Sequence, residues 1–164
     1  MDNRDVLMAI AGVAATFIGF AGVVFAVGRA SQGGVSTPEQ TALVHLLLPA
    51  IAVLFLAFLP LVASAGFTSQ PQIWRASNGL LGAIHLMLIA NATRAAMRSR
   101  LLEPVPLRFV LIPGGFLAVA ANVAVVLGFL PRFSAMIFIG GLVWFLLVSA
   151  VQFVMLIFVA ARAT

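Results

Sequence analysis

The sequence contains no cysteine, no tyrosine and no lysine, and only four of its 164 residues are acidic. Without cysteine, the chain has no disulfide framework, no thiolate nucleophile and no thiolate ligand for a metal ion. The four acids all lie outside the long apolar stretches, so no intramembrane carboxylate is present for acid–base chemistry. Because no catalytic motif is visible either, we expect a protein that is not an enzyme and that has no cofactor.

Charge is scarce as well, at 8% of residues, whereas 63% are hydrophobic. Soluble domains usually carry about a quarter charged residues, so this composition indicates an integral membrane protein. All nine basic residues are arginine, and the pI of about 11.9 follows from that imbalance rather than from a nucleic-acid-binding surface. We expect the arginines to meet anionic lipid headgroups and expect no nucleic-acid partner.

Long apolar segments dominate the rest of the chain. A membrane-spanning helix needs about 20 mostly apolar residues. Five segments satisfy this length: 6–27, 42–66, 77–97, 109–130 and 133–161. The sequence therefore predicts an all-α membrane protein, a bundle of five transmembrane helices with short loops that forms a single transmembrane domain over residues 1–164. The third segment is the least apolar, and the acids near the N-terminus argue against a cleavable signal peptide.

The distribution of arginine predicts the orientation. With five spans, one side of the membrane receives three arginines and the other side receives six. The smaller set is Arg4, Arg75 and Arg132, and the larger set is Arg29, Arg94, Arg98, Arg100, Arg108 and Arg162. The positive-inside rule places the larger set in the cytoplasm. We therefore expect the N-terminus outside and the C-terminus inside.

The first segment, "IAGVAATFIGFAGVVFAV", has small residues at alternating spacings of three and four. This row consists of Gly12, Ala15, Gly19, Gly22 and Ala26, and we call it the seam of the first segment. Small residues let membrane helices approach closely. The simpler interpretation is that the segment sits centrally, with neighbouring helices pressed against the seam. The alternatives are that the seam lines a pore or forms an oligomer contact. Similar small residues recur in the fourth and fifth segments, including Gly114 and Gly141.

Several stretches resemble a known group of sequences. These are "IAGVAATFIGFAGVVFAVG", "LPAIAVLFLAFLPLV", "IWRASNGLL" and "GLVWFLLVSAVQFVMLI". They occur in this order over most of the chain and are similar to those of a group of small uncharacterised bacterial integral membrane proteins. The resemblance implies a bacterial inner-membrane location. It implies no activity, and no functional residue is carried over from it.

Polar residues within spans are costly and are candidates for function. Estimated depths place His85 and Asn122 together in the outer half of the membrane, as a candidate polar pair near Thr16. A second set falls in the cytoplasmic half and is a candidate polar cavity: His45, Asn91, Arg94, Ser149 and Gln152. The alternative for each residue is structural, because hydrogen bonds between membrane helices are common and an arginine near a helix end can extend to the headgroups.

The positions of the histidines and the scarcity of other ligands argue against haem and metal sites. His45 and His85 differ in estimated depth by more than about 10 Å, so they are not expected to share a haem iron. Zinc lacks ligands, because cysteine is absent and the acids lie outside the spans. We expect no metal.

Three classes of function remain open. The first is a homo-oligomeric channel or small-solute transport protein, the second a non-catalytic accessory or scaffold subunit of a larger membrane complex, and the third a binder of a lipid, quinone or other hydrophobic ligand. Membrane lipids and either further copies of the chain or a larger complex are the expected partners. Transport ranks slightly ahead, because the set of buried polar residues is richer than scaffolding requires.

Overall fold

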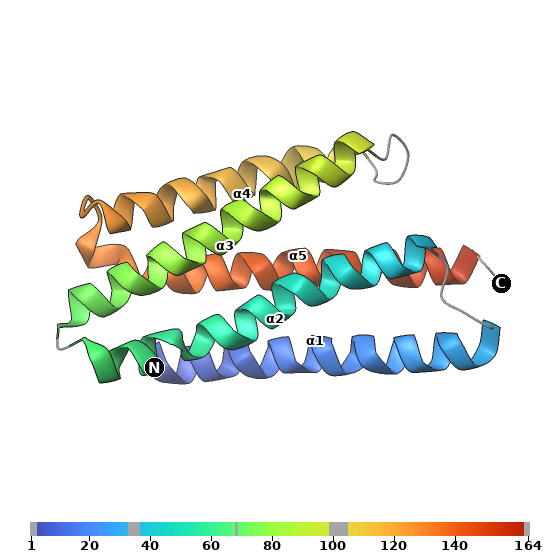
Figure 1. Ribbon diagram of the computed structural model, residues 1–164, viewed down its shortest axis with the longest axis horizontal. Helices are drawn as coiled ribbons and strands as arrows, with labels where there is room; N and C mark the ends of the chain where they lie inside the picture. The colour runs from blue at the N-terminus through green and yellow to red at the C-terminus, as the bar shows by residue number, and fades with distance from the viewer. Residues whose placement is uncertain (1–2, 33–36, 68, 99–104, 163–164) are drawn as a thin grey trace. The chain divides into compact units, whose positions relative to one another are not determined.

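The computed structural model describes residues 3–32, 37–67, 69–98 and 105–162, and the regular structure in these ranges is entirely helical. Five α-helices follow one another along the chain (Figure 1): α1 (Asn3–Gln32), α2 (Thr37–Gly66), α3 (Gln70–Arg98), α4 (Val105–Val126) and α5 (Ser134–Arg162). One short 3-10 helix, Pro131–Phe133, precedes α5. The predicted all-α fold is confirmed.

Four segments of the described chain are long and apolar enough to cross a membrane. They are Asn3–Ala26, Leu43–Gly66, Gln70–Asn91 and Pro131–Met155. The chain is therefore a multi-span integral membrane protein. The expected fourth span, 109–130, differs from the others, because the described apolar part of α4 covers only Ile112–Val126.

The C-terminal end of α4 explains part of this difference. Gly128 has a φ of +86°, a left-handed conformation that suits glycine. The amide of Gly128 donates to the carbonyl of Val125 at 3.0 Å, and the amide of Phe129 donates to that of Ala124 at 2.9 Å. These two bonds form a Schellman motif, which satisfies the last carbonyls of a helix and ends it. The helix thus stops four residues before the expected boundary at Leu130.

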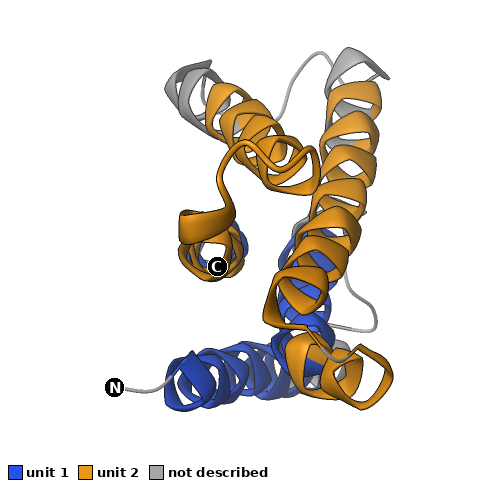
Figure 2. Cartoon of the chain, turned by 90° about the vertical axis from the view of Figure 1, so that its left-hand side faces the viewer, with its two compact units in different colours: residues 1–58, 145–164 blue, residues 59–144 orange. Residues whose placement is uncertain are grey.

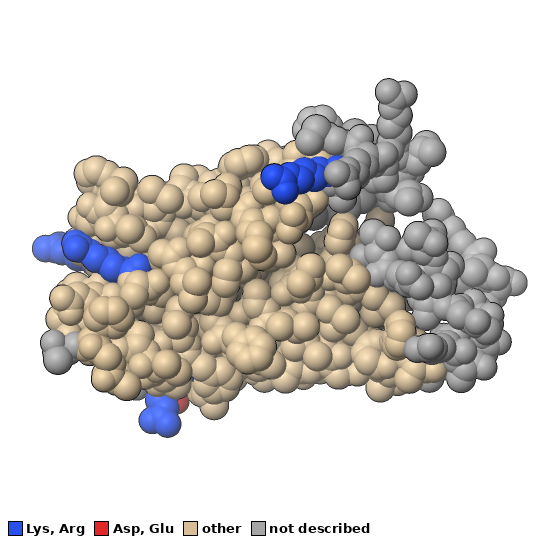
Figure 3. All heavy atoms as spheres, viewed as in Figure 1, with Lys and Arg blue, Asp and Glu red and all other residues tan. Residues whose placement is uncertain are grey.

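The described surface is largely apolar. Phe55 on α2, Leu117 on α4 and Met136 on α5 are each 72% exposed. Figure 3 shows few charged atoms among the described residues on the face it presents. Large apolar side chains that remain exposed along helices of this length are suited to contact with lipid tails.

The helices divide into two compact units, coloured separately in Figure 2. Unit 1 comprises residues 1–58 and 145–164, and unit 2 comprises residues 59–144. Helices α2 and α5 each contribute one part to each unit, because the unit boundaries fall within them.

Unit 1 contains α1, most of α2 and the second part of α5. Its core cluster consists of Ala21, Leu43 and Leu46. Phe153 of α5 packs against this cluster and meets the ring of Phe20 edge-on, with ring centroids 5.0 Å apart. Within the unit, α1 and α5 run in the same direction and α2 runs opposite to them (Figure 1). The first and last described residues therefore lie at opposite ends of unit 1.

Unit 2 is built around an antiparallel pair, α3 and α4. Their contacts follow one register: Gly79 meets Val126, Gly82 meets Asn122 and Ile89 meets Gly115. A Cβ atom added at Gly82 would lie 3.2 Å from Cβ of Asn122, and one at Gly115 would lie 2.8 Å from Cδ1 of Ile89. Glycine thus permits the close approach of these two helices.

The first part of α5 packs against α3 and α4 in the same way. Trp74 of α3 contacts Phe138, with ring centroids 5.9 Å apart. A Cβ atom added at Gly141 would lie 2.7 Å from Cδ2 of Leu81. Gly114 of α4 lies directly beneath the indole ring of Trp144. The three helices of unit 2 are therefore held together at glycine contacts, including those of the fourth and fifth segments that the sequence had marked as rich in small residues.

Candidate functional site

Buried polar side chains concentrate in unit 2. Helices α3, α4 and α5 each contribute at least one that is less than a tenth exposed: Ser77, Asn78, His85, Asn122 and Ser134. Three of these five belong to α3, which is also the helix with the most polar span. Polar groups at membrane depth are costly unless they are hydrogen-bonded, so the partners of these side chains decide what the unit can do.

Asn78 ties α3 to the start of α5. Its Nδ2 donates to the carbonyl of Trp74 at 2.8 Å and to the carbonyl of Ser134 at 3.0 Å. The Oδ1 atom of Asn78 is buried and has no hydrogen-bond partner among the described residues. The amide is therefore satisfied as a donor and unsatisfied as an acceptor.

Asn122 of α4 has the same imbalance. Its Nδ2 donates to the carbonyl of Ala118 at 2.7 Å, one turn earlier in the same helix. Its Oδ1 atom is buried without a hydrogen-bond partner in the described part of the chain. Because Asn122 packs on Gly82, and Gly82 lies about 6 Å along α3 from Asn78, the two side chains are about one helical turn apart. We call Asn78 and Asn122 the amide pair.

Ser77 is buried too, and its Oγ atom has no hydrogen-bond partner within the described ranges. It lies about 140° around α3 from Gly82 at the helical repeat, on a different side of the helix from the contact with α4. Ser77 therefore does not belong to the amide pair.

The predicted outer pair, His85 and Asn122, lies within unit 2, and each side chain is 1% exposed. His85 is three residues beyond Gly82, the contact point of Asn122, and its Cε1 atom would lie 3.6 Å from a Cβ atom at Gly141. His85 thus sits where α3 meets α5, one turn from Asn122. A direct interaction between the two side chains stays a prediction. Thr16 belongs to unit 1, where its hydroxyl donates to the carbonyl of Gly12 at 2.9 Å.

The predicted polar cavity falls into two groups. Unit 1 holds Ser149 and Gln152, which are buried on α5, and His45, which is half-buried on α2. Asn91 and Arg94 are exposed in unit 2. The Ser149 hydroxyl donates to the carbonyl of Leu46 at 3.2 Å, which links α5 to α2. This bond is the structural role that the sequence left open for Ser149. A common cavity for the five residues stays a prediction.

The seam of the first segment lies on α1, is called the α1 seam from here on, and faces away from the core of unit 1. All five of its residues are exposed, and a Cβ atom added at Gly12, Gly19 or Gly22 would meet no described heavy atom within 4 Å. The buried face of α1 carries Leu7, Ile10, Ala11, Ala14 and Ala21 instead. Within the described part of unit 1 the buried face, and not the seam, meets the core, so a helix pressed against the seam stays a prediction.

The amide pair was only half identified from the sequence. Asn122 was a candidate, but Asn78 was not, because the expected third span began at 77 and so placed Asn78 at a membrane surface. In the structure α3 begins at Gln70, so Asn78 lies two turns inside the helix. Its spacing of four residues from Gly82 was the available signal, since residues four apart share a helix face.

In the described part of the chain, no group of three or more His, Asp or Glu side chains could hold a metal ion. The fold and its buried contacts define a helical, multi-span integral membrane protein. No family model, curated protein or solved structure matches the chain.

Proposed function

We propose that this protein is a homo-oligomeric membrane transport protein for small, uncharged hydrogen-bond donors, and that the amide pair lies on their path. The observation that carries this proposal is the burial of two carboxamide oxygens, on Asn78 and Asn122, without donors among the described residues. An unsatisfied oxygen within the hydrocarbon region costs several kcal/mol. A species that donates hydrogen bonds offsets this cost as it passes.

The charge and the packing of unit 2 limit which solutes the protein could transport. The only acidic residue between 59 and 144 is Glu103, which lies in the linker between α3 and α4. A cation beside the amide pair would therefore lack a nearby carboxylate, and an isolated buried charge is very costly. An anion would face the two acceptor oxygens. The helices pack closely at Gly82, Gly114 and Gly141, which disfavours large solutes. These features favour molecules such as water, ammonia or urea.

The proposed arrangement has five membrane crossings, with the N-terminus outside and the C-terminus inside. The described ends of the chain lie at opposite ends of unit 1 (Figure 1), which suits an odd number of crossings. The 22 residues of α4 rise by about 33 Å, enough to cross the hydrocarbon layer. The arginine distribution and the resemblance to small bacterial membrane proteins support a bacterial inner membrane as the location.

Flux into proteoliposomes tests the transport proposal. Stopped-flow light scattering would follow water, ammonia, urea and chloride entry into vesicles with the protein and without it. We expect faster entry of one or more neutral species and unchanged chloride entry. Asn122→Leu should abolish the gain, because it removes an acceptor at similar volume. Ser149→Ala is the matched control, since that buried hydroxyl already has a partner.

A second candidate function follows from the exposed α1 seam. Gly12, Gly19 and Gly22 leave an open surface on unit 1 that suits close contact with another membrane helix. If vesicles containing the protein match empty vesicles for every solute, the accessory-subunit function becomes the better proposal. Native mass spectrometry distinguishes the two assemblies: further copies of the chain fit the first proposal, and a different protein that co-purifies fits the second.

A further inference from the structure

The turn between α4 and α5 brings together basic and apolar groups at one end of unit 2. We call residues 127–133 the α4–α5 corner. Arg75, from the second turn of α3, reaches this corner: one terminal nitrogen of its guanidinium would lie 2.9 Å from a Cβ atom at Gly128. The guanidinium thus rests on the last turn of α4, where the negative end of the helix dipole attracts a cation. Arg132, within the corner itself, is exposed.

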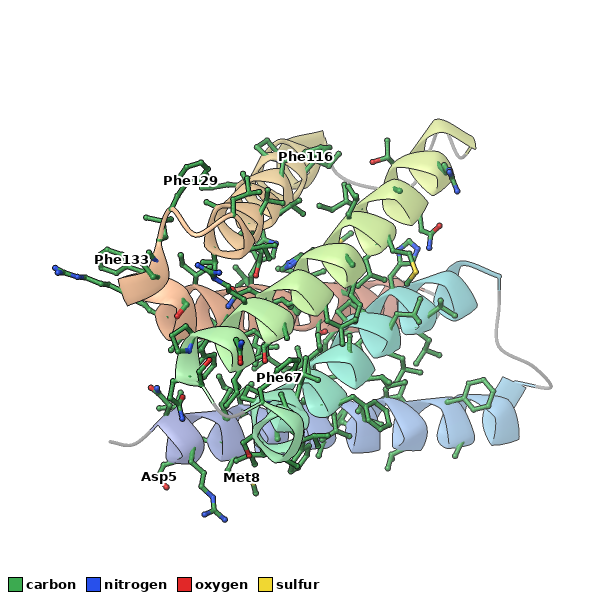
Figure 4. All side chains as sticks on the ribbon, turned by 60° about the vertical axis from the view of Figure 1, so that its left-hand side comes forward. Asp5, Met8, Phe67, Phe116, Phe129 and Phe133 are labelled. Atoms are coloured by element: carbon green, nitrogen blue, oxygen red, sulfur yellow. The ribbon has the colours of Figure 1, made fainter. Side chains whose placement is uncertain are left out.

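The same corner exposes bulky apolar side chains. Phe129 is 74% exposed, Leu127 64% and Phe133 54%. Figure 4 labels Phe129 and Phe133, which extend away from the neighbouring helices. A short linker between membrane helices lies at the level of the headgroups, and apolar side chains there can enter the adjacent acyl layer. The corner therefore offers contacts to both parts of a lipid.

Arg75 and Arg132 have no acidic partner among the described residues of unit 2, because none of these residues is acidic. A guanidinium group presents a planar fork of donors that matches a phosphate. Exposed apolar side chains at a corner with two arginines favour a phosphate that carries acyl chains over a free phosphate ion.

We propose that the α4–α5 corner binds one anionic phospholipid, with Arg75 and Arg132 as the basic groups that attract its headgroup and with its acyl chain along Leu127 and Phe129. Gly128 is part of this site, because any side chain there would displace the Arg75 guanidinium. The site shares no residue with the amide pair, although Asn78 donates to the carbonyl of the neighbouring Ser134, and its test measures lipid binding, which does not depend on transport.

Native mass spectrometry of the full-length protein in detergent tests this site. Phosphatidylglycerol and phosphatidylcholine of the same acyl composition would be titrated against the wild type, Arg75→Gln, Arg132→Gln and Arg94→Gln. We expect the wild type to prefer phosphatidylglycerol. Loss of a charge-assisted hydrogen bond should weaken phosphatidylglycerol binding by about tenfold in each corner variant. Arg94→Gln is the matched control, because Arg94 is an exposed arginine near the other end of the same helix.

Three results would overturn the proposal. The first is equal affinity for the two lipids, and the second is an equal loss of binding in Arg94→Gln. The third is displacement of phosphatidylglycerol by millimolar inorganic phosphate, which would indicate a phosphate site without a lipid requirement. Arg132→Gln keeps the test decisive even if Arg75→Gln fails to fold, since Arg132 is exposed and its replacement leaves the packing of Gly128 intact.

Discussion

Gly114 of α4 lies directly beneath the indole ring of Trp144 of α5, so close that a methyl group on Gly114 would overlap the ring. We predict that Gly114→Ala destabilises the protein by about 1–3 kcal/mol, the usual cost of overpacking a well-packed contact. Gly140→Ala is the control, because a Cβ atom there would meet no described heavy atom within 4 Å. Thermal unfolding in detergent should show a lower Tm for the first variant only. Equal Tm values would mean that Trp144 can move aside without cost.

A second prediction concerns the end of α4. Gly128→Ala should cost about 1–2 kcal/mol, because alanine is disfavoured at the φ of +86° that this residue adopts. Asparagine tolerates the left-handed conformation better, so Gly128→Asn should cost less. In an Arg75→Gln background, Gly128→Ala should still be destabilising, since the backbone strain remains after the guanidinium contact has gone. Denaturation in detergent measures all three, and no loss in Gly128→Ala would contradict the assigned φ.

The helices were predictable because long apolar runs report membrane spans directly. The boundaries were less predictable. The stretch "TSQPQ" resembles a linker, yet α3 begins at Gln70 and includes Pro71 in its first turn, where proline loses no helical hydrogen bond. At the same end of the antiparallel α3–α4 pair, α4 stops early because of the conformation of Gly128, which a run of apolar residues does not reveal.

The packing partners were harder to predict than the helices. A periodic row of small residues shows that one face of α1 is smooth, but not whether that face meets another helix. Ala11, Ala14 and Ala21, on a different face of α1, are buried instead. Likewise, the bond from Asn78 to the carbonyl of Ser134 joins residues 56 apart in sequence, and no local pattern encodes such a pairing.

The exposed seam leads to a third prediction, about folding and assembly. Gly19→Leu should leave the stability of the monomer unchanged, because nothing in unit 1 lies against Gly19, but it should weaken association of the proposed homo-oligomer. Phe153→Ala should have the opposite effect, with a loss of about 2 kcal/mol or more in stability, because its ring packs on the core cluster of unit 1. Unfolding experiments and native mass spectrometry separate the two. A folding defect in Gly19→Leu, with Phe153→Ala unaffected, would refute this assignment of the faces.

The fourth prediction decides whether α4 crosses the membrane. Because the protein has no native cysteine, single cysteines introduced at Ser69, Ser99 and Leu130 can be labelled individually with an impermeant maleimide. Five crossings with the N-terminus outside place Ser69 and Leu130 on the outer face, where we expect labelling of intact cells. Position 99 lies between α3 and α4 in sequence and should react only after permeabilisation. Ser149→Cys is the control for accessibility and should stay unlabelled under both conditions, because that side chain is fully buried. The reverse pattern at all three positions would preserve the five crossings but invert the orientation derived from the arginines. Labelling of positions 99 and 130 from the same face would instead show that α4 does not cross, which leaves four crossings and both termini on one side.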